Sequence, residues 1–326
     1  MREMRVEKKT FPLHSPFVIT GYTFTELQAI WVTLTQNGHS GRGEACGIYY
    51  LGDTQDSMAA ELENVRAAVE AGASREDIQG LLAPGGARNA LDCAMWDFEC
   101  KTRGVTIWEL LSIDPHELTT VATIGIGTPD EMAQRAVELS NFSKLKVKLD
   151  SNQPIERLSA IREGRPDAEL VVDANQGWSV DQLIDIAPEL EALGIDMVEQ
   201  PLTRGSDADM ARVPRHIPMG ADESLLSLDE YDQVAPLYDV INIKLDKCGG
   251  LTEALSIVER VRADGKKIMV GNMTGTSLSM APSYVVGQFA EFVDIDGSVL
   301  LSHDIPEGLS YKDGGVVTIP APTLWG

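Results

Sequence analysis

The sequence predicts an α/β protein in which a (β/α)8-type TIM barrel follows a smaller α+β domain. Three observations lead to this prediction. Short apolar runs recur after residue 118, segments with a helical pattern separate them, and the residues before them have a different pattern. The chain of 326 residues is longer than a typical single-core domain, but it is long enough for a barrel with an added domain.

The recurring apolar runs have the spacing of barrel strands. There are eight, at residues 120–127, 144–149, 169–175, 196–201, 218–224, 239–247, 267–273 and 291–297. Lys148, Asp173, Glu199, Asp222 and Lys244 lie in five consecutive runs, separated by 25, 26, 23 and 22 residues. A strand, a helix and two loops need about that length, and regular strand–helix alternation is typical of a parallel sheet. Eight such units predict a closed barrel.

The segments between the runs fit helices. Residues 128–141 begin with Thr as N-cap, Pro at the first helical position and acids in the first turn. Residues 179–194 have apolar residues near helical spacing and end at a Gly.

The first part of the chain has another organisation. Residues 25–45 predict a hairpin that turns at Asn37-Gly38, and residues 88–104 predict an amphipathic helix closed by a Gly. We therefore expect three parts. They are an N-terminal capping domain (1–115), the barrel (116–300) and a C-terminal segment that returns to the capping domain (301–326).

Composition excludes several classes of partner. The formal net charge of −23 argues against binding to nucleic acid or to anionic membranes. No charged-then-apolar leader and no apolar run near 20 residues is present, so we expect a cytoplasmic protein. The four cysteines form no C-x-x-C pair and the five histidines have no metal-binding spacing, which favours reduced thiols and structural histidines. The oligomeric state stays open, and a homo-oligomer is compatible with the sequence.

The stretch KLKVKLD (144–150) places Lys144, Lys146 and Lys148 on one face of a strand. Such a face is typical of a solvated edge strand, where lysines block aggregation. The alternative is a face that points into a cavity where a lysine does chemistry. A closed barrel has no edge, so the prediction of eight strands favours the cavity.

Acidic residues end three consecutive strands of the predicted barrel. Asp173, Glu199 and Asp222 would form an oxygen-rich cluster that suits a hard cation such as Mg²⁺. One such Asp alone would be explained as the N-cap of the next helix, but three in a row favour a metal site. Lys148 and Lys244 come from strands two and six, which lie opposite each other in a ring of eight. This arrangement suits removal of a proton from one face of a carbon and its return to the other.

A lysine with an ordinary pKa near 10.4 is a poor base at neutral pH. We expect Lys146 and the divalent cation to lower the pKa of Lys148. Asp246 would act in the opposite sense on Lys244 if the two are close, and the sequence leaves that balance open.

Several motifs resemble those of the enolase superfamily, in its muconate-lactonizing subgroup and among the dipeptide epimerases (L-Ala-D/L-Glu epimerase type). They are ARNALDCAMWD (87–97), KLKVKLD (144–150), VVDANQGW (171–178), VEQPL (198–202), ADES (221–224), INIKLDKCGGLTEAL (241–255) and DIDG (294–297). These stretches span most of the chain in the order of the family.

The resemblance implies an Mg²⁺-dependent isomerase (EC 5.1.1.-) that inverts the α-carbon of the second residue of an L-Ala-L-Xaa dipeptide. Lys148 and Lys244 would transfer the proton through a metal-stabilised enediolate. Asp173, Glu199 and Asp222 would hold the metal. Lys146 would tune the site beside the substrate, and the D-x-D motif of strand eight, Asp294 and Asp296, would bind the dipeptide's α-ammonium group.

One departure from the family concerns the second residue of the dipeptide. Relatives that act on Ala-Glu carry an Arg in the early loop, where this chain has Phe24. Burying a carboxylate against Phe without a partner is costly. With Tyr22, Ile48, Tyr49 and Tyr50, Phe24 would form an apolar lid, so we expect an apolar or aromatic second residue. The alternative is that these are ordinary core or hairpin residues of the capping domain.

Three other functions remain open. The same lysines and carboxylates would serve an o-succinylbenzoate synthase, a cycloisomerase or an N-acylamino acid racemase. A metal-free aldolase would use a Schiff-base lysine. A binding protein without catalysis is never excluded by the fold.

Overall fold

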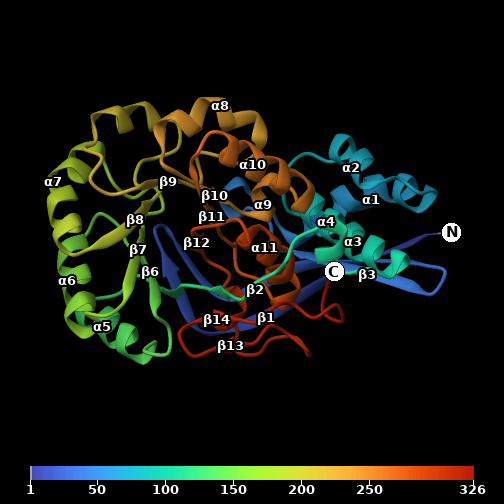
Figure 1. Ribbon diagram of the computed structural model, residues 1–326, viewed down its shortest axis with the longest axis horizontal. Coiled ribbons are helices and arrows are strands. Elements are labelled where there is room, and N and C mark those ends of the chain that lie inside the picture. The colour runs from blue at the N-terminus through green and yellow to red at the C-terminus, as the bar shows by residue number, and fades with distance from the viewer. Residues whose placement is uncertain (1) are drawn as a thin grey trace.

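The barrel consists of eight parallel strands in chain order. The computed structural model describes residues 2–326, and Figure 1 shows the barrel beside a domain formed by the N-terminal third of the chain. The strands are β5 (Ala122–Ile124), β6 (Lys144–Lys148), β7 (Glu169–Asp173), β8 (Ile195–Glu199), β9 (Met219–Ala221), β10 (Val240–Ile243), β11 (Lys267–Val270) and β12 (Phe292–Val293). Each of the eight predicted runs overlaps one of them, and β8 begins one residue before its run, so the predicted barrel is confirmed.

Hydrogen bonds join the residues before β5 to the last strand and to the residues after it. The Val121 backbone N–H donates to Val293 O at 2.9 Å, and the Ile295 N–H donates to Thr120 Oγ1 at 3.0 Å. These contacts bring the end of β12 next to the start of β5. The residues after β12 therefore reach the same site as those of β6 and β7.

Helices surround the strands. They are α5 (Pro129–Glu138), α6 (Pro154–Gly164), α7 (Val180–Ala192), α8 (Tyr231–Val234), α9 (Leu245–Cys248), α10 (Leu251–Ala263) and α11 (Ser277–Gly287), with 3-10 turns η2 (Asp207–Arg212), η3 (Leu228–Glu230), η4 (Ala235–Leu237) and η5 (Gly297–Leu300). The predicted start of α5 is confirmed, because the Thr128 side chain accepts from the Glu131 N–H. The helix predicted at residues 179–194 is α7.

The capping domain packs a three-stranded antiparallel sheet against helices. Its elements are β1 (Glu3–Ile19), β2 (Tyr22–Gln36), β3 (His39–Ala45), η1 (Tyr49–Leu51), α1 (Gln55–Ala71), α2 (Arg75–Leu81), α3 (Gly86–Arg103) and α4 (Ile107–Leu111). The predicted turn between β2 and β3 is confirmed, with φ of 53° at Asn37 and 83° at Gly38. Gly104 ends α3 in the left-handed region, as predicted.

Glycines let α3 lie directly on β3. A Cβ at Gly41 would come within 2.2 Å of the Phe98 backbone nitrogen, and one at Gly43 within 2.1 Å of Ala90 O. A larger side chain at either position would push the helix off the sheet. This close packing holds the N-terminal end of α3 over the barrel.

The C-terminal segment contacts both domains. Its strands β13 (Tyr311–Lys312) and β14 (Val316–Val317) pair with β4 (Leu118–Thr119) in a small sheet below the barrel strands. Farther on, the Arg42 guanidinium donates to Leu324 O at 2.6 Å, and the Gly326 N–H donates to Asp97 at 2.8 Å. The last residues of the chain therefore lie against the capping domain.

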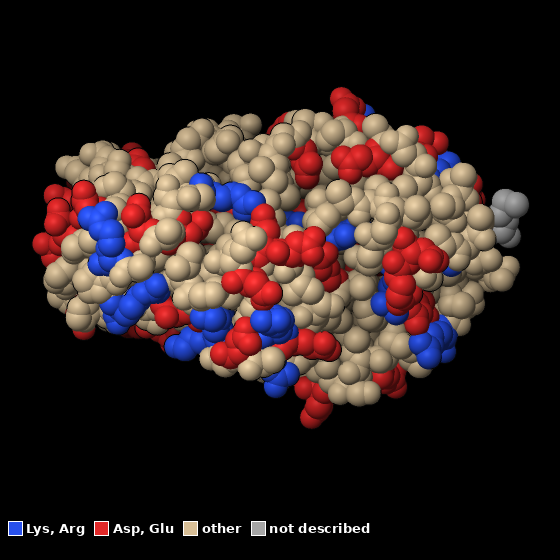
Figure 2. Space-filling model, turned by 90° about the horizontal axis from the view of Figure 1, so that it is seen from above, with Lys and Arg blue, Asp and Glu red and all other residues tan. Residues whose placement is uncertain are grey.

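The surface carries charges of both signs. On the face in Figure 2, Asp and Glu side chains are spread along the length of the molecule, and Lys and Arg lie among them. Within residues 2–326, no helix has both the length and the apolar character needed to cross a bilayer.

Candidate active site

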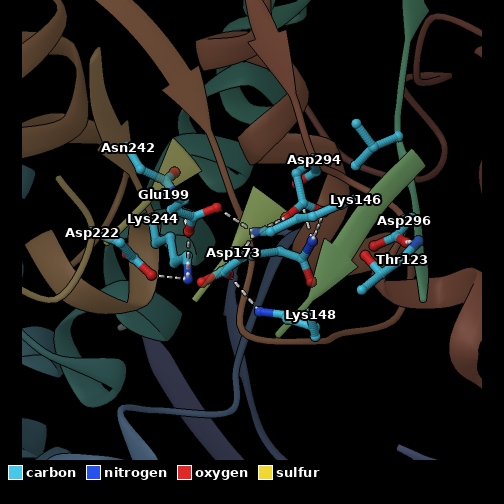
Figure 3. A network of polar contacts seen from close by, with 12 residues as sticks. Thr123, Lys146, Lys148, Asp173, Glu199, Asp222, Asn242, Lys244, Asp294 and Asp296 are labelled. Atoms are coloured by element: carbon cyan, nitrogen blue, oxygen red, sulfur yellow. Dashed lines mark hydrogen bonds and ion pairs between the residues drawn. The ribbon is translucent and has the colours of Figure 1, made fainter. Parts of the chain in front are cut away.

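Three buried carboxylates meet at the carboxyl ends of neighbouring strands (Figure 3). Asp173 and Glu199 are the last residues of β7 and β8 and are paired in register, and Asp222 follows β9 directly. One oxygen from each lies within 4.8 Å of the others, and each residue is at most 1% exposed. The three side chains predicted to hold a metal are thus brought together.

Two lysines contact this cluster from different sides. Lys148, the last residue of β6, places Nζ 2.6 Å from Asp173 Oδ2. Lys244, which follows β10, places Nζ 2.6 Å from Asp222 Oδ2. Figure 3 shows the two ammonium groups separated by the carboxylates. Both lysines also line the main cavity of the protein.

Lys146 has surroundings that differ from those we expected. Its Nζ lies 2.7 Å from Glu199 Oε2, 2.8 Å from Asp294 Oδ2 and 3.1 Å from Asp173 Oδ2. Burial alone would lower its pKa, but the three carboxylates raise it well above the ordinary value. Lys146 is therefore a fully charged partner of the acids.

The pKa of Lys244 is also raised well above its ordinary value. Burial lowers it, and the carboxylates of Asp222 and Glu199 outweigh that effect. The expected influence of Asp246 takes another form. Its carboxylate accepts from the Gly47 N–H at 2.8 Å and the Cys46 N–H at 3.1 Å, so it binds the capping domain to the residues after β10.

The pKa values of the cluster acids are shifted in opposite directions. Burial raises the pKa of Asp222, but Lys244 and Lys247 together bring it well below the ordinary value. Glu199 is different, because burial and the neighbouring Asp173 raise its pKa to about 8. The lysines thus leave Glu199 the least stabilised anion of the three.

The cluster fits a divalent cation. Within residues 2–326, the buried Glu199 Oε2 has no hydrogen-bond donor, and its neighbour Lys146 approaches it as an ion pair outside hydrogen-bond geometry. Lys146 shares its single charge among Glu199, Asp173 and Asp294, so a divalent cation would give this oxygen a further positive partner. Carboxylate oxygens are the type of ligand that a hard divalent cation such as Mg²⁺ prefers.

Of the two acids after β12, Asp294 reaches the cluster through Lys146, and Asp296 lies beside Thr123 (Figure 3). Asp294 is 3% exposed, and its Oδ2 faces Lys146 while its Oδ1 accepts from Asn272 Nδ2 at 3.0 Å. Asp296 is 2% exposed and accepts from the Thr123 N–H at 2.7 Å. Burial, and then the charge of Asp294, raise the pKa of Asp296 to about 7. Their predicted role toward an ammonium group stays a prediction.

A cavity of about 380 Å³ lies between the lysines and the capping domain. Phe24 of β2 and Tyr49 of η1 form part of its wall. Their rings contact each other, with centroids 5.1 Å apart, and Tyr22 and Tyr50 pack against Tyr49 at 4.6 and 5.2 Å. Of the predicted lid residues, Phe24 and Tyr49 line the cavity. Tyr22 is 44% exposed and packs against these aromatic rings from outside.

The hairpin between β1 and β2 extends to the mouth of the barrel. The Thr20 hydroxyl at its tip lies 3.2 Å from Leu149 O and 3.3 Å from Ala174 O, each one residue beyond a site residue. The Ile126 N–H also donates to Val18 O at 2.8 Å. The hairpin is thereby held directly above Lys148 and Asp173.

Two residues of the site were not predicted from the sequence. Lys247 is 1% exposed and donates to Asp222, and Asn272 lines the cavity and donates to Asp294. Lys247 is three residues after Lys244, so the two share one side of a helical turn, and that spacing was the available signal. Asn272 lies in the predicted seventh strand and carries no comparable pattern.

Comparison with known proteins gives matches along the whole chain. Residues 1–112 match the domain described as mandelate racemase / muconate lactonizing enzyme, N-terminal domain, and residues 130–322 match the domain described as enolase C-terminal domain-like. The chain is 37% identical to the L-Ala-D/L-Glu epimerase of Escherichia coli K12, over 96% of this chain and 99% of that one.

Solved structures agree with these matches. An enolase family member from Agrobacterium tumefaciens with homology to dipeptide epimerases, with bound sodium and L-Ala-L-Glu, is 36% identical with a TM-score of 0.97 and full coverage of both chains. A dipeptide epimerase from Enterococcus faecalis V583, complexed with Mg and L-Leu-L-Tyr, is 27% identical with a TM-score of 0.90, covering 98% of this chain and 96% of that one.

Proposed function

Because the chain belongs to the mandelate racemase/muconate lactonizing enzyme family of the enolase superfamily, we propose that it is an Mg²⁺-dependent dipeptide epimerase. It inverts the α-carbon of the second residue of an L-Ala-L-Xaa dipeptide. The observation that carries this proposal is the placement of Lys148 and Lys244 on two sides of the carboxylate cluster, each facing the same cavity.

The two lysines divide the proton transfer. An α-carbon held between them presents its C–H bond to one Nζ, which must be neutral to accept the proton. The other Nζ, as an ammonium, returns a proton to the opposite face and inverts the centre. After the inversion, the two lysines have exchanged their protonation states. This is the arrangement needed to invert the product back to the substrate. The buried position of both lysines keeps water away from the carbanionic centre.

Asp173, Glu199 and Asp222 would hold the Mg²⁺. When bound, the cation supplies positive charge beside the substrate carboxylate, where negative charge develops as the α-proton leaves.

Asp294 and Asp296 would receive the α-ammonium group of the dipeptide. Both carboxylates are buried, and Asp294 shares the Lys146 ammonium with Asp173 and Glu199. A substrate with a free ammonium group suits this pair of acids better than an N-acylated amino acid does. This supports a dipeptide over the N-acylamino acid and cycloisomerase alternatives.

We further propose that the second residue of the dipeptide is apolar or aromatic. Among the described residues that line the cavity, the basic side chains are Lys148 and Lys244, and both are engaged with the cluster. The wall formed by the capping domain carries Phe24 and Tyr49 together with two acidic residues, Glu26 and Asp53. A substrate Glu side chain would find aromatic rings, acids and neutral polar groups there but, among the described lining residues, no free basic side chain to balance its charge.

A panel of L-Ala-L-Xaa dipeptides tests both statements. Epimerisation is followed by exchange of the α-proton in D₂O with Mg²⁺ present. We expect the highest kcat/KM with Leu, Phe or Tyr as the second residue, and Phe24→Arg should shift the preference toward Glu. Fastest turnover of L-Ala-L-Glu by the unmodified protein would overturn the specificity, and no exchange with any dipeptide would overturn the reaction.

A further inference from the structure

Each of the three cluster carboxylates has one oxygen held by a donor behind the site. Asp173 Oδ1 accepts from the Asn175 backbone N–H at 2.9 Å. Glu199 Oε1 accepts from Asn242 Nδ2 at 2.7 Å, and Asp222 Oδ1 accepts from Lys247 Nζ at 2.7 Å. We call the N–H of Asn175, the amide of Asn242 and the ammonium of Lys247 the outer donors. The other oxygens, Asp173 Oδ2, Glu199 Oε2 and Asp222 Oδ2, have the shortest contacts with the site lysines, of 2.6 to 2.7 Å. Lys244 Nζ also lies 3.8 Å from Glu199 Oε1, beyond hydrogen-bond distance.

Lys247 is the most tightly fixed of the outer donors. It belongs to the short helix α9, is 1% exposed, and donates to Asp222 O at 2.6 Å and Asn242 O at 3.0 Å in addition to Asp222 Oδ1. Three acceptors at these distances satisfy all three ammonium protons. The side chain is therefore held without freedom to release Asp222 Oδ1.

Asn242 is fixed by the space around it. It is fully buried on β10, and within residues 2–326 its Oδ1 has no hydrogen-bond donor. A Cβ added at Gly271 would come within 2.6 Å of that oxygen, so the neighbouring strand holds the amide closely. The buried amide thus has its hydrogen bond to Glu199 and leaves its own oxygen unsatisfied, which indicates that its position serves the carboxylate.

We propose that the outer donors limit each cluster carboxylate to a single oxygen for the metal, and that the site thereby selects Mg²⁺ over Ca²⁺. This inference rests on the proposed function, in which these carboxylates hold a divalent cation. Mg²⁺ needs a compact octahedral shell and binds one or two carboxylates with several waters. Ca²⁺ takes more oxygens at longer distances and readily accepts both oxygens of a carboxylate. A side-chain oxygen already bonded to an outer donor is withheld from the larger ion.

Replacement of an outer donor changes geometry and charge together, and a comparison of the two ions separates these effects. Removing the Lys247 ammonium raises the attraction for any divalent cation. Mg²⁺ and Ca²⁺ carry the same charge, so this electrostatic change affects both dissociation constants alike. The ratio of the two constants then reports how many oxygens the carboxylates offer.

The experiment is calorimetric titration of the metal-stripped protein with MgCl₂ and with CaCl₂. The variants are Lys247→Met, which frees Asp222 Oδ1, and Asn242→Leu, which frees Glu199 Oε1. Lys266→Met is the matched control, since Lys266 makes one hydrogen bond, to Tyr238 O at 2.7 Å, away from the cluster. We expect unmodified protein and control to prefer Mg²⁺. Each outer-donor variant should shift the Kd ratio toward Ca²⁺ by about tenfold or more, the usual effect of such partners on metal affinity.

The outcomes separate the two proposals. A Kd ratio in both outer-donor variants equal to that of the Lys266→Met control overturns the selectivity, whatever the absolute affinities. Tighter binding of Ca²⁺ than of Mg²⁺ by the unmodified protein also overturns it, and this measurement does not depend on whether a variant folds. Binding of neither ion by the unmodified protein contradicts the metal site of the proposed function instead.

Discussion

The Lys146 ammonium lies 2.8 Å from Asp294 Oδ2. This contact connects β6 to the residue that follows β12, across the intervening strand β5. Both side chains are almost fully buried. In a barrel, the inward side chains of alternate strands form common layers. Lys146, Glu199 and Asp294 come from the second, fourth and eighth strands and meet in such a layer. The predicted ammonium-binding acid is therefore already part of the charge balance of the cluster.

Asp294→Asn should weaken the binding of the dipeptide. The amide keeps the shape of the side chain but removes its charge, while Lys146 retains Asp173 and Glu199 as partners. A hydrogen bond to a charged group contributes about 1.5–3 kcal/mol, so we expect kcat/KM to fall roughly 10- to 100-fold, mainly through KM. Steady-state kinetics with Asp313→Asn, an exposed acid, as control would measure this. An unchanged KM would remove Asp294 from the ammonium site.

Lys148→Ala and Lys244→Ala should each abolish epimerisation. Each variant should still exchange the α-proton of one of the two epimers with solvent. The remaining lysine can still remove and return the α-proton on its own face, so each variant should exchange one epimer in D₂O and lose the other. General acid–base catalysis contributes about 10²- to 10⁴-fold, which sets the expected loss in kcat. Lys144→Ala is the control, because Lys144 is on the same strand and pairs with Glu169 at 2.8 Å.

If either lysine variant epimerises the dipeptide at the rate of the control, the two-lysine reaction is wrong. Exchange of the same epimer by both variants would also contradict it, because the two lysines would then serve one face.

Mg²⁺ should stabilise the folded protein by binding to the cluster. Glu199 is buried with a pKa raised to about 8, so its ionisation opposes folding until a cation faces it. At a Mg²⁺ concentration 100 times the Kd, stabilisation should be about 2.7 kcal/mol. Thermal unfolding with Mg²⁺ and with EDTA measures it. Asp222→Asn should lose the response, and a variant that still responds as the unmodified protein does would show that the ion binds elsewhere.

The sequence was sufficient for the strands and the acids at their ends. The regular step between Lys148, Asp173, Glu199, Asp222 and Lys244 indicates parallel strands, and the carboxyl ends of such strands meet at one edge. That edge brings the three carboxylates together in the structure.

The surroundings of each lysine could not be predicted in the same way. The charge on Lys146 depends on how the ends of β7, β8 and β12 are placed relative to β6, which decides that three acids converge on one Nζ. The expectation that Lys146 would tune Lys148 considered only the neighbouring lysine and a cation. Asp246 binds Gly47, which is 199 residues away in the sequence, and no local pattern encodes that contact. Lys247 lies within the predicted run 239–247, but the structure places it on a short helix after β10.

Glu44 should make the stability of the protein decrease as the pH rises. It lies on β3 and accepts from the Thr276 N–H, at the start of α11, and from Trp31 Nε1, both at 2.7 Å. Burial raises its pKa from 4.5 to about 7. Between these values the folded protein binds more protons than the unfolded chain, so the free energy of unfolding falls across this window and levels off above it. Glu44→Gln cannot ionise, and its lost hydrogen bond is independent of pH. The stability of the unmodified protein relative to Glu44→Gln, from urea unfolding at pH 5 and pH 8, should therefore drop by on the order of 3 kcal/mol. A difference that is constant or rises with pH would mean that Glu44 ionises in the folded protein as readily as in the unfolded chain.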